Sequence, residues 1–270
     1  AVDPVKSGED EKIGSGLQRI SEEDPTIRVE RNPETRETVL SGMGEQHIQN
    51  VVNRLRSMFK VEVDLRTPKV PYRETINAVG QAQYRHKKQT GGHGQFAEVH
   101  LRVEPLPDED FEFDNEVVGG NIPKNFIPAV EKGVVEAMAE GPLAGCKVIN
   151  MKAVVYDGKH HPVDSSEMAF KIASRSAFRA AMEQAKPTLL EPIMSLKIIF
   201  PDEYMGDISG DLNSRRGRIL GMDTEEGMQV VNAEVPLAEA YTYPTQLRSI
   251  TQGRGTFEME FTRYETVPAN

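Results

Sequence analysis

The chain has 270 residues and a formal net charge of −10, with 38% hydrophobic and 27% charged residues. This length fits two or three domains, and the acidic balance excludes a protein that coats DNA non-specifically. The single cysteine, Cys146, excludes an intrachain disulfide framework and a zinc cluster of several cysteines. No apolar run is long enough to cross a bilayer, and the N-terminus lacks a signal-peptide pattern, so we expect a cytoplasmic protein without a membrane partner.

The first segment, residues 1–68, alternates between helical and strand patterns. Apolar spacings of three and four predict helices over about residues 8–20 and after Gly44, and β-rich runs predict the strands between them. The order is that of a ferredoxin-like βαββαβ domain. The strands are expected at residues 1–2, 26–30, 38–41 and 59–65.

The middle segment, residues 69–188, begins after the proline-bracketed linker Thr67–Pro71. Strand-like runs are expected at residues 72–83, 96–103 and 148–156, and helices at residues 123–139 and 165–185. The basic, glycine-broken loop Arg85–Gln95 falls between the first two strand-like runs, where a hairpin tip belongs. Glycines let the backbone turn sharply, and the neighbouring cations suit a phosphate backbone or, equally, a solvated surface.

A second loop, Asp157–Asp164, lies between a strand and a helix of the same segment. Asp164 and Glu167 have the spacing of a capping box at the start of that helix. Both loops could project from one end of the domain, which would gather the candidate nucleic-acid-binding residues there. These are Lys87, Lys88, Gly91, Gly92, His93, Gly94, Gln95, Lys159, His160 and His161.

The last segment, residues 189–270, again has the order βαββαβ. Strands are expected at residues 194–200, 217–222, 228–236 and 255–264, and helices at residues 204–215 and 238–251. The whole chain is therefore predicted to be an α+β protein, with two ferredoxin-like domains flanking a different middle domain. Arginine favours bidentate phosphate contact, and near a helix C-terminus it also complements the helix dipole. The residues open to either interpretation are Arg215, Arg216, Arg248 and Arg254.

Enzymatic interpretations of the same loops are weaker. No G-x-x-x-x-G-K-S/T motif for nucleotide binding occurs in the chain. A metal-dependent hydrolase using His160, His161 and Asp164 is an alternative, but adjacent histidines on a turn rarely converge on one ion. Ser165 and Ser166 are better explained as helix-capping residues than as nucleophiles. We therefore expect no catalytic residue, cofactor or metal in this chain.

Short motifs in all three segments resemble those of elongation factor G, in the same order. The first segment and its end carry Ser21–Thr26, Ser41–His47 and Pro71–Ile76. The middle segment carries Gly91–Gln95, Gly141–Gly145 and Val163–Glu167. The last segment carries Leu190–Met194, Gly206–Leu212, Arg215–Gly217 and Thr245–Ser249.

The resemblance implies domains III, IV and V of a ribosome-acting translational GTPase. In that family, domains III and V are ferredoxin-like, and domain IV is similar to the second domain of ribosomal protein S5. The resemblance further implies that GTP and magnesium bind an N-terminal GTPase domain, which a β-barrel domain follows. Residues 91–95 and 159–163 match the tip of domain IV, which enters the small-subunit decoding region and engages transfer RNA and messenger RNA. Domain V lies near the large-subunit stalk base and the sarcin–ricin region.

Three departures from the family pattern are similar to the second type of elongation factor G that some bacteria carry. His93 stands where arginine is usual, Lys159–Pro162 replaces Ser-Tyr-His-Asp, and Thr242–Thr245 replaces Gly-Tyr-Ala-Thr. A histidine gives a weaker, pH-dependent phosphate contact than arginine. The alternatives to translocation are a role in ribosome recycling and a stand-alone RNA-binding module.

Overall fold

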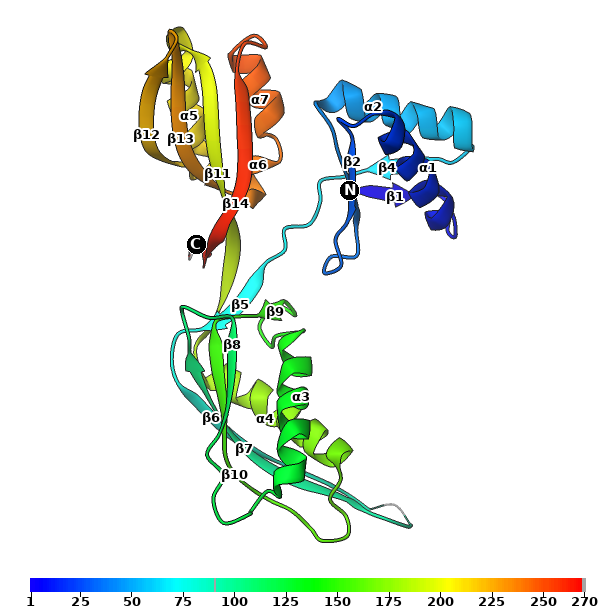
Figure 1. Cartoon of the computed structure of the whole chain (residues 1–270), viewed down its shortest axis with the longest axis vertical. Coiled ribbons are helices and arrows are strands. Elements are labelled where there is room, and N and C mark those ends of the chain that lie inside the picture. Colours follow the sequence, from blue (N-terminus) through cyan, green and yellow to red (C-terminus); the bar gives the residue numbers. More distant parts are fainter. Residues whose placement is uncertain (90, 269–270) are drawn as a thin grey trace. The chain divides into compact units, whose positions relative to one another are not determined.

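The computed structural model describes residues 1–89 and 91–268, so Thr90 of the predicted basic loop lies outside the described residues. The chain forms two compact units (Figure 1). The first combines Ala1–Pro71 with Pro192–Arg263, and the second combines Tyr72–Glu191 with residues 264–268.

The N-terminal part of the first unit has a four-stranded antiparallel sheet in the order β2-β3-β1-β4, which is the ferredoxin-like arrangement. Helix α1 contributes Ile13, Leu17 and Ile20 to a buried core that Val51 and Leu55 complete. This order confirms the predicted βαββαβ pattern. The elements are β1 (Val2–Pro4), α1 (Asp10–Glu23), β2 (Arg28–Arg31), β3 (Thr38–Ser41), α2 (Glu45–Arg54) and β4 (Val63–Leu65).

The prediction of a strand over residues 59–65 is wrong at its beginning. A π-helical turn, Leu55–Phe59, extends α2, and Lys60 then adopts a left-handed backbone with φ of 56°. Phe59 therefore packs against the core from the helix, and only Val63–Leu65 forms the strand. An alternating apolar pattern cannot distinguish these arrangements, because a helical turn can bury the same side chain.

The second unit is built on a four-stranded sheet in the order β6-β7-β10-β8, with two helices against one face (Figure 1). Alternate residues of β7 (Ala97, Val99, Leu101 and Val103) point into the core and are fully buried. The elements are β5 (Arg73–Ile76), β6 (Gly80–Lys88), β7 (Gln95–Pro105), β8 (Phe111–Asn115), α3 (Ile127–Met138), β9 (Lys147–Val148), β10 (Met151–Lys159), α4 (Glu167–Gln184) and the start of β11 (Pro187–Pro201).

Two strand predictions for the second unit need correction, and one strand was missed. The predicted run over residues 72–83 is two strands, because the amides of Asn77 and Ala78 bond to the carbonyl of Ala185 and turn the chain away. The run over residues 148–156 breaks at Asn150, whose φ is 57°. Strand β8 was not predicted at all, although it pairs in parallel with β10 and buries part of Phe111 and Phe113.

The side chain of Glu74 is fully buried and organises the turn after α3. Its carboxylate accepts hydrogen bonds from the amides of Leu143 (2.9 Å), Ala144 (2.8 Å) and Cys146 (2.9 Å). A side chain at Gly141 would lie 2.2 Å from this carboxylate, so the turn requires glycine there. Three amide donors are the kind of environment in which a buried carboxylate is stable.

The C-terminal part of the first unit repeats the ferredoxin-like arrangement, with β13 and β14 on either side of β11 and β12 next to β13. The predicted helix over residues 238–251 is interrupted, and the second helix begins with Pro244 in its first turn. The elements are α5 (Met205–Ser214), β12 (Arg218–Glu225), β13 (Met228–Pro236), α6 (Leu237–Ala240), α7 (Tyr243–Ile250) and β14 (Thr256–Thr266).

Glu234, on β13, is a buried carboxylate held by two arginines. Arg263 donates to both of its oxygens at 2.6 and 2.9 Å, and Arg218 donates at 2.7 Å. Hydrogen bonds from Arg263 and then Arg218 lower the pKa of Glu234 to about 2. This carboxylate therefore joins three strands of the sheet.

We predict that Glu74→Ala exposes the turn at Leu143–Cys146, because three amides lose their acceptor. The free energy of local opening of this turn should fall by about 3 kcal/mol, which corresponds to roughly 100-fold faster exchange of these amide hydrogens. Amide hydrogen exchange by NMR measures this directly. Glu183→Ala, at an exposed position of α4, is the matched control and should leave the exchange unchanged. Equal protection in Glu74→Ala and wild type would contradict this role of Glu74.

A pH dependence follows from Glu234. The pKa of Glu234 is lower in the folded state than in an unfolded chain. Its contribution to the free energy of unfolding is therefore complete above about pH 5 and is lost as the pH falls toward 2. We expect Glu234→Gln to lower the free energy of unfolding of the first unit by about 2 kcal/mol at pH 7. Between about pH 5 and pH 2, this free energy should fall less steeply in the variant than in wild type. Urea unfolding at several pH values tests this expectation, and parallel pH profiles for both proteins would refute it.

Candidate nucleic-acid interface

The basic loop forms the tip of the hairpin between β6 and β7, as predicted. The two strands remain paired as far as Lys88 and Gln95, so Arg85–Lys88 belong to β6 rather than to the loop. His86 contacts the side-chain oxygen of Gln95 at 2.8 Å and fixes that side chain beside the strand. Lys87, Lys88, Gly91, Gly92 and His93 are exposed. The hairpin therefore presents its cations at the end of the sheet.

The second loop is bonded directly to the base of this hairpin tip. The side chain of Asp164 accepts from the amide of Gly94 at 3.1 Å, and its carbonyl accepts from the amide of Phe96 at 2.9 Å. Ser165 donates from its hydroxyl to the carbonyl of Phe96 at 2.7 Å. A side chain at Gly94 would lie 2.9 Å from the Asp164 carboxyl carbon, so only glycine allows this approach. The two loops therefore form one surface.

This contact corrects the predicted role of Asp164. Ser166, rather than Asp164, caps α4, because its hydroxyl accepts from the amide of Ala169 at 3.1 Å. The expected helix-capping role for the serine pair holds at Ser166. Asp164 has the spacing of a capping residue, but its carboxylate bonds to a glycine 70 positions earlier in the chain. Sequence spacing carries no signal for a partner that distant.

A third loop, between β8 and α3, also reaches this end of the second unit and was not predicted. Nδ1 of His160 contacts the carbonyl oxygen of Asn121 at 3.1 Å, and the Asn121 side chain donates to Asp157 at 2.8 Å. The latter bond is the main cause that lowers the pKa of Asp157. The paired glycines Gly119 and Gly120, both with φ near 70°, were the available sign of a turn here.

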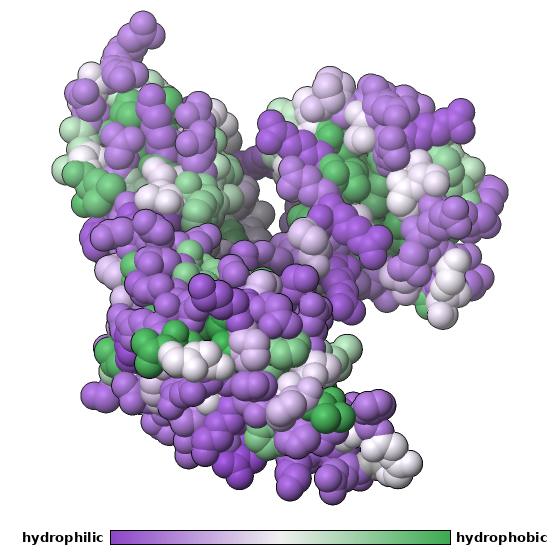
Figure 2. All heavy atoms as spheres, turned by 60° about the horizontal axis from the view of Figure 1, so that its bottom comes forward, coloured by the Kyte–Doolittle hydropathy of each residue, from purple (hydrophilic) through white to green (hydrophobic). Residues whose placement is uncertain are grey.

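Cations on the open face of the sheet form ion pairs, whereas the lysines at its tip form none with the described residues. Away from the tip, the cations are paired: Arg85 with Glu98, Arg102 with Glu104 and Glu116, and Lys152 with Glu112 and Asp114. Within residues 1–89 and 91–268, no ion pair involves Lys87, Lys88 or Lys159. Hydrophilic residues predominate on the face of this unit in Figure 2, with separate hydrophobic side chains between them. On the described part of this sheet, the lysines without an ion pair thus lie toward the tip, and Lys159 among them still interacts electrostatically with Glu98 and Asp157.

The pairing beneath the tip keeps its acidic residue ionised. Burial of Glu98 opposes ionisation, but hydrogen bonds from His100 (2.9 Å) and from Arg85 outweigh burial and lower the pKa of Glu98. The ring of Tyr156 lies edge-on to His100, with 5.8 Å between ring centroids. Arg85 is therefore occupied by Glu98, and the cations of the hairpin that remain for a ligand are those nearer its end.

The four candidate arginines of the last segment already have partners within the first unit. Arg215 is largely buried, donates to Asp211 (2.8 Å) and to the carbonyl of Glu239 (2.7 Å), and stacks over Tyr243. This arrangement favours a structural role for it. Arg216 lies 3.8 Å from Glu239, and Arg254 contacts Glu203 and Tyr204. Both keep exposed side chains, so ribosomal RNA contact by these two stays a prediction.

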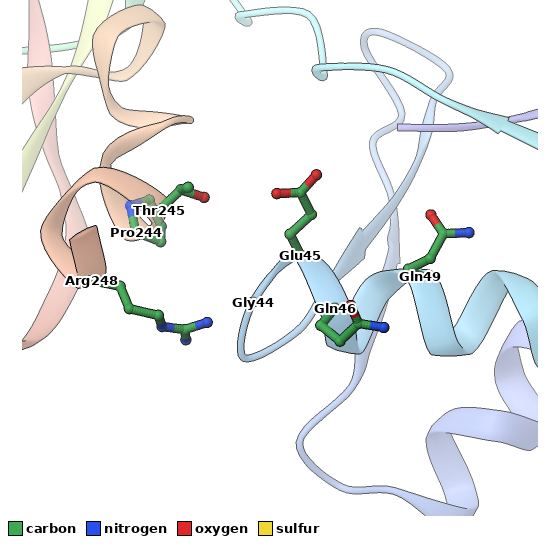
Figure 3. Close-up of a pocket in the computed structure, with 7 residues that line it drawn as sticks. All are labelled: Gly44, Glu45, Gln46, Gln49, Pro244, Thr245 and Arg248. Atoms are coloured by element: carbon green, nitrogen blue, oxygen red, sulfur yellow. The ribbon is translucent and has the colours of Figure 1, made fainter. Parts of the chain in front are cut away.

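Arg248 borders a small pocket in the first unit. Its guanidinium donates to the carbonyl of Met43 at 2.8 Å, and a side chain at Gly44 would meet it at 2.6 Å. Figure 3 shows Arg248 directed toward Gly44 at the start of α2. The pocket has a volume of about 340 Å³. Its lining consists of Gly44, Glu45, Gln46, Gln49, Pro244, Thr245 and Arg248.

The metal-hydrolase alternative finds no support in this geometry. His160 and His161 bind different backbone groups, because Nδ1 of His161 faces the amides of Val163 and Asp164. Across the described part of the chain, no group of three or more His, Cys, Asp or Glu side chains is placed to hold a metal ion. Within the same residues, no helix is both long and apolar enough to span a membrane.

Comparison with known proteins identifies the family. Three family models match consecutive parts of the chain: "Elongation Factor G, domain III" at residues 1–67, "Elongation factor G, domain IV" at residues 68–186, and "Elongation factor G C-terminus" at residues 188–270. The chain belongs to the elongation factor G family. It is therefore related to the elongation factors of protein biosynthesis, as its motifs predicted.

Similar proteins cover nearly the whole of this chain. Elongation factor G of Thermotoga maritima is 51% identical and that of Thermotoga neapolitana 49% identical, each over 99% of the chain. The chain spans 39% of the length of either relative. A crystal structure of a Thermus thermophilus protein superposes with a TM-score of 0.90 at 46% identity, covering 99% of this chain and 40% of that one. The α+β fold class predicted from the sequence agrees with these matches.

We predict that Gly94→Ala and Asp164→Ala each separate the two loops without unfolding the second unit. In Asp164→Ala, the Gly94 amide loses a charged acceptor, and its hydrogen exchange should accelerate about ten-fold. Asp164→Asn retains an acceptor oxygen and should restore most of the protection. Gly14→Ala, where a side chain meets open space, controls for glycine replacement. Unchanged exchange at residues 94 and 96 in both variants would contradict the contact.

Proposed function

We propose that this chain forms domains III, IV and V of an elongation factor G that promotes movement of transfer RNA and messenger RNA on the ribosome. The proposed domains are residues 1–68, 69–188 and 189–270. GTP and magnesium would bind an N-terminal GTPase domain of the longer protein, which acts in the cytoplasm. This chain would contribute binding and positioning rather than catalysis. Family membership, together with the tip of the second unit, supports the proposal.

The proposal that the tip binds RNA is supported by the difference between paired and unpaired cations on the sheet. Arg102 and Lys152 on the same sheet have acidic partners within 3.3 Å, so their charge is already balanced. Lys87, Lys88 and Lys159 instead remain available for phosphate groups. In an acidic chain, such a cluster directs RNA to one place and leaves the remaining surface repulsive to it.

The proposed mechanism is steric and electrostatic. The tip would occupy the small-subunit decoding region beside the transfer RNA–messenger RNA duplex. Such binding favours the displaced state only if the tip contacts that state better than the starting one. The bond between Asp164 and Gly94 keeps both loops in one arrangement, so less conformational entropy is lost when RNA binds. The C-terminal arginines Arg216 and Arg254 would approach the stalk base and the sarcin–ricin region of the large subunit.

We predict that replacing Lys87, Lys88 and Lys159 together by alanine weakens RNA binding by this chain at least about ten-fold. The slope of log affinity against log salt concentration should become shallower by roughly 2 to 3, because three phosphate contacts disappear. In the full-length factor, the same variant should slow translocation and leave ribosome-stimulated GTP hydrolysis intact. Fluorescence titration and single-round translocation assays measure these effects.

Lys152→Ala provides the matched control, since it removes one lysine of the same sheet that is already paired. It should leave RNA affinity nearly unchanged. If both variants bind RNA as well as wild type and translocate normally, the tip does not have the proposed role. A ribosome-recycling assay run in parallel decides between recycling and translocation as the step that requires these lysines.

A further inference from the structure

The adjacent rings of His160 and His161 are held in different tautomers by their backbone contacts. Nδ1 of His160 lies 3.1 Å from the carbonyl oxygen of Asn121. A carbonyl only accepts, so this nitrogen carries the hydrogen and donates. Nδ1 of His161 lies 3.1 Å from the amide of Asp164 and 3.3 Å from that of Val163. Amides only donate, so this nitrogen presents its lone pair.

In a neutral imidazole only one nitrogen carries a hydrogen, so the other end of each ring is determined. Nε2 of His160 is an acceptor, and Nε2 of His161 is a donor. Both residues are exposed. The Asp164 carboxylate lies 3.5 Å from Nδ1 of His161, farther than the Asp164 amide at 3.1 Å. The two adjacent rings therefore offer one acceptor next to one donor.

The acceptor is unusual on a surface suited to phosphate. Lysine, exposed amides and Nε2 of His161 all donate, which matches phosphate oxygens, since these only accept. The ribose 2′-hydroxyl, in contrast, can donate, and it is the group that distinguishes RNA from DNA. An acceptor beside Lys159 therefore has a partner in an RNA backbone that a DNA backbone lacks.

We propose that Nε2 of His160 accepts a hydrogen bond from a ribose 2′-hydroxyl of RNA bound at the tip, so that His160 makes the tip selective for RNA over DNA. Nε2–H of His161 donates to a phosphate oxygen of the same strand. This contact does not discriminate RNA from DNA, because both have phosphate groups. This inference rests on the proposed RNA-binding function and names the group that gives it selectivity.

The third loop holds the acceptor in place. Asn121, which accepts from His160, donates through its side chain to Asp157 at 2.8 Å. The next residue, Ile122, is buried against Gly158, where a side chain would lie 2.6 Å from the Ile122 methyl group. Asp157 and Gly158 lie near the end of β10, just before His160, so the segment that carries the carbonyl is packed against the strand that carries the ring. The direction of the acceptor is thus set before RNA arrives.

Two-bond ¹H–¹⁵N NMR correlation on the 270-residue chain at pH 8 tests the geometry without any ligand. His160 should show the hydrogen on Nδ1, and His161 should show it on Nε2. Single His160→Gln and His161→Gln variants assign the two signals. A hydrogen on Nε2 of His160 would remove the acceptor and overturn the inference, whatever the chain binds.

Binding measurements at the same pH test the function. Fluorescence anisotropy should compare an RNA hairpin with a DNA hairpin of the same sequence. Wild type should bind the RNA about five-fold more tightly, the usual value of one hydrogen bond. His160→Phe should lose this preference by weakening RNA binding while leaving DNA binding unchanged. His161→Phe and Lys159→Ala should weaken binding of both hairpins equally.

The outcomes separate the inference from the function on which it rests. If Lys159→Ala weakens RNA binding but His160→Phe does not, or if His160→Phe weakens both hairpins equally, only the role of His160 is overturned. If wild type binds neither hairpin, the proposed function and this inference fail together. An RNA with a single 2′-deoxy position that loses about five-fold affinity for wild type and none for His160→Phe supports the direct contact.

Discussion

The hydrogen bonds between Asp164 and the base of the β6–β7 hairpin determine the shape of the candidate site. They join a carboxylate and a carbonyl to the amides of Gly94 and Phe96, so two loops about 70 residues apart in sequence behave as one surface. Because Gly94 has no side chain, the carboxylate can reach its amide, which explains why a glycine is needed at that position.

This arrangement also shows how an acidic protein can present cations without an ion pair, among the residues described, at one end of a sheet. The net charge of −10 would repel RNA from most of the surface. On the open face of the second unit, the structure neutralises cations one by one, with Arg85, Arg102 and Lys152 each held by carboxylates. Lys87 and Lys88 lie beyond this paired region, whereas Lys159 lies opposite Glu98 in the pairing of β10 with β7. Local pairing, rather than the net charge of the chain, therefore determines which cations of this sheet, as far as it is described, have no ion pair.

The sequence predicted the parts of the fold that depend on local patterns. Strands β3 and β13, the helix around Val130 and Val134, and the hairpin tip were all recognised from periodicity and turn residues. Strand β8 and the breaks at Asn77 and Asn150 were missed, because they depend on pairing with distant segments. A local pattern cannot show such pairing.

The same limit applies to the candidate site. Lysines and glycines signalled the two loops, and the motifs signalled the family, but the partners of Asp164 and His160 lie far away in sequence. Arg215 shows the opposite error, since its position near a helix end did not reveal that Asp211, Glu239 and Tyr243 surround its guanidinium. Charged side chains are informative about function only when their intramolecular partners are known.

The central claim is that both loops form one RNA-binding surface, and site-specific crosslinking tests it most directly. A photoreactive side chain placed at His93 in the hairpin, and separately at Val163 in the second loop, should crosslink the full-length factor to the same RNA segment of the ribosomal complex. In Asp164→Ala, each of the two positions should crosslink to several RNA segments instead of one shared segment. Crosslinks from the two positions to different molecules, or to ribosomal protein alone, would contradict the account.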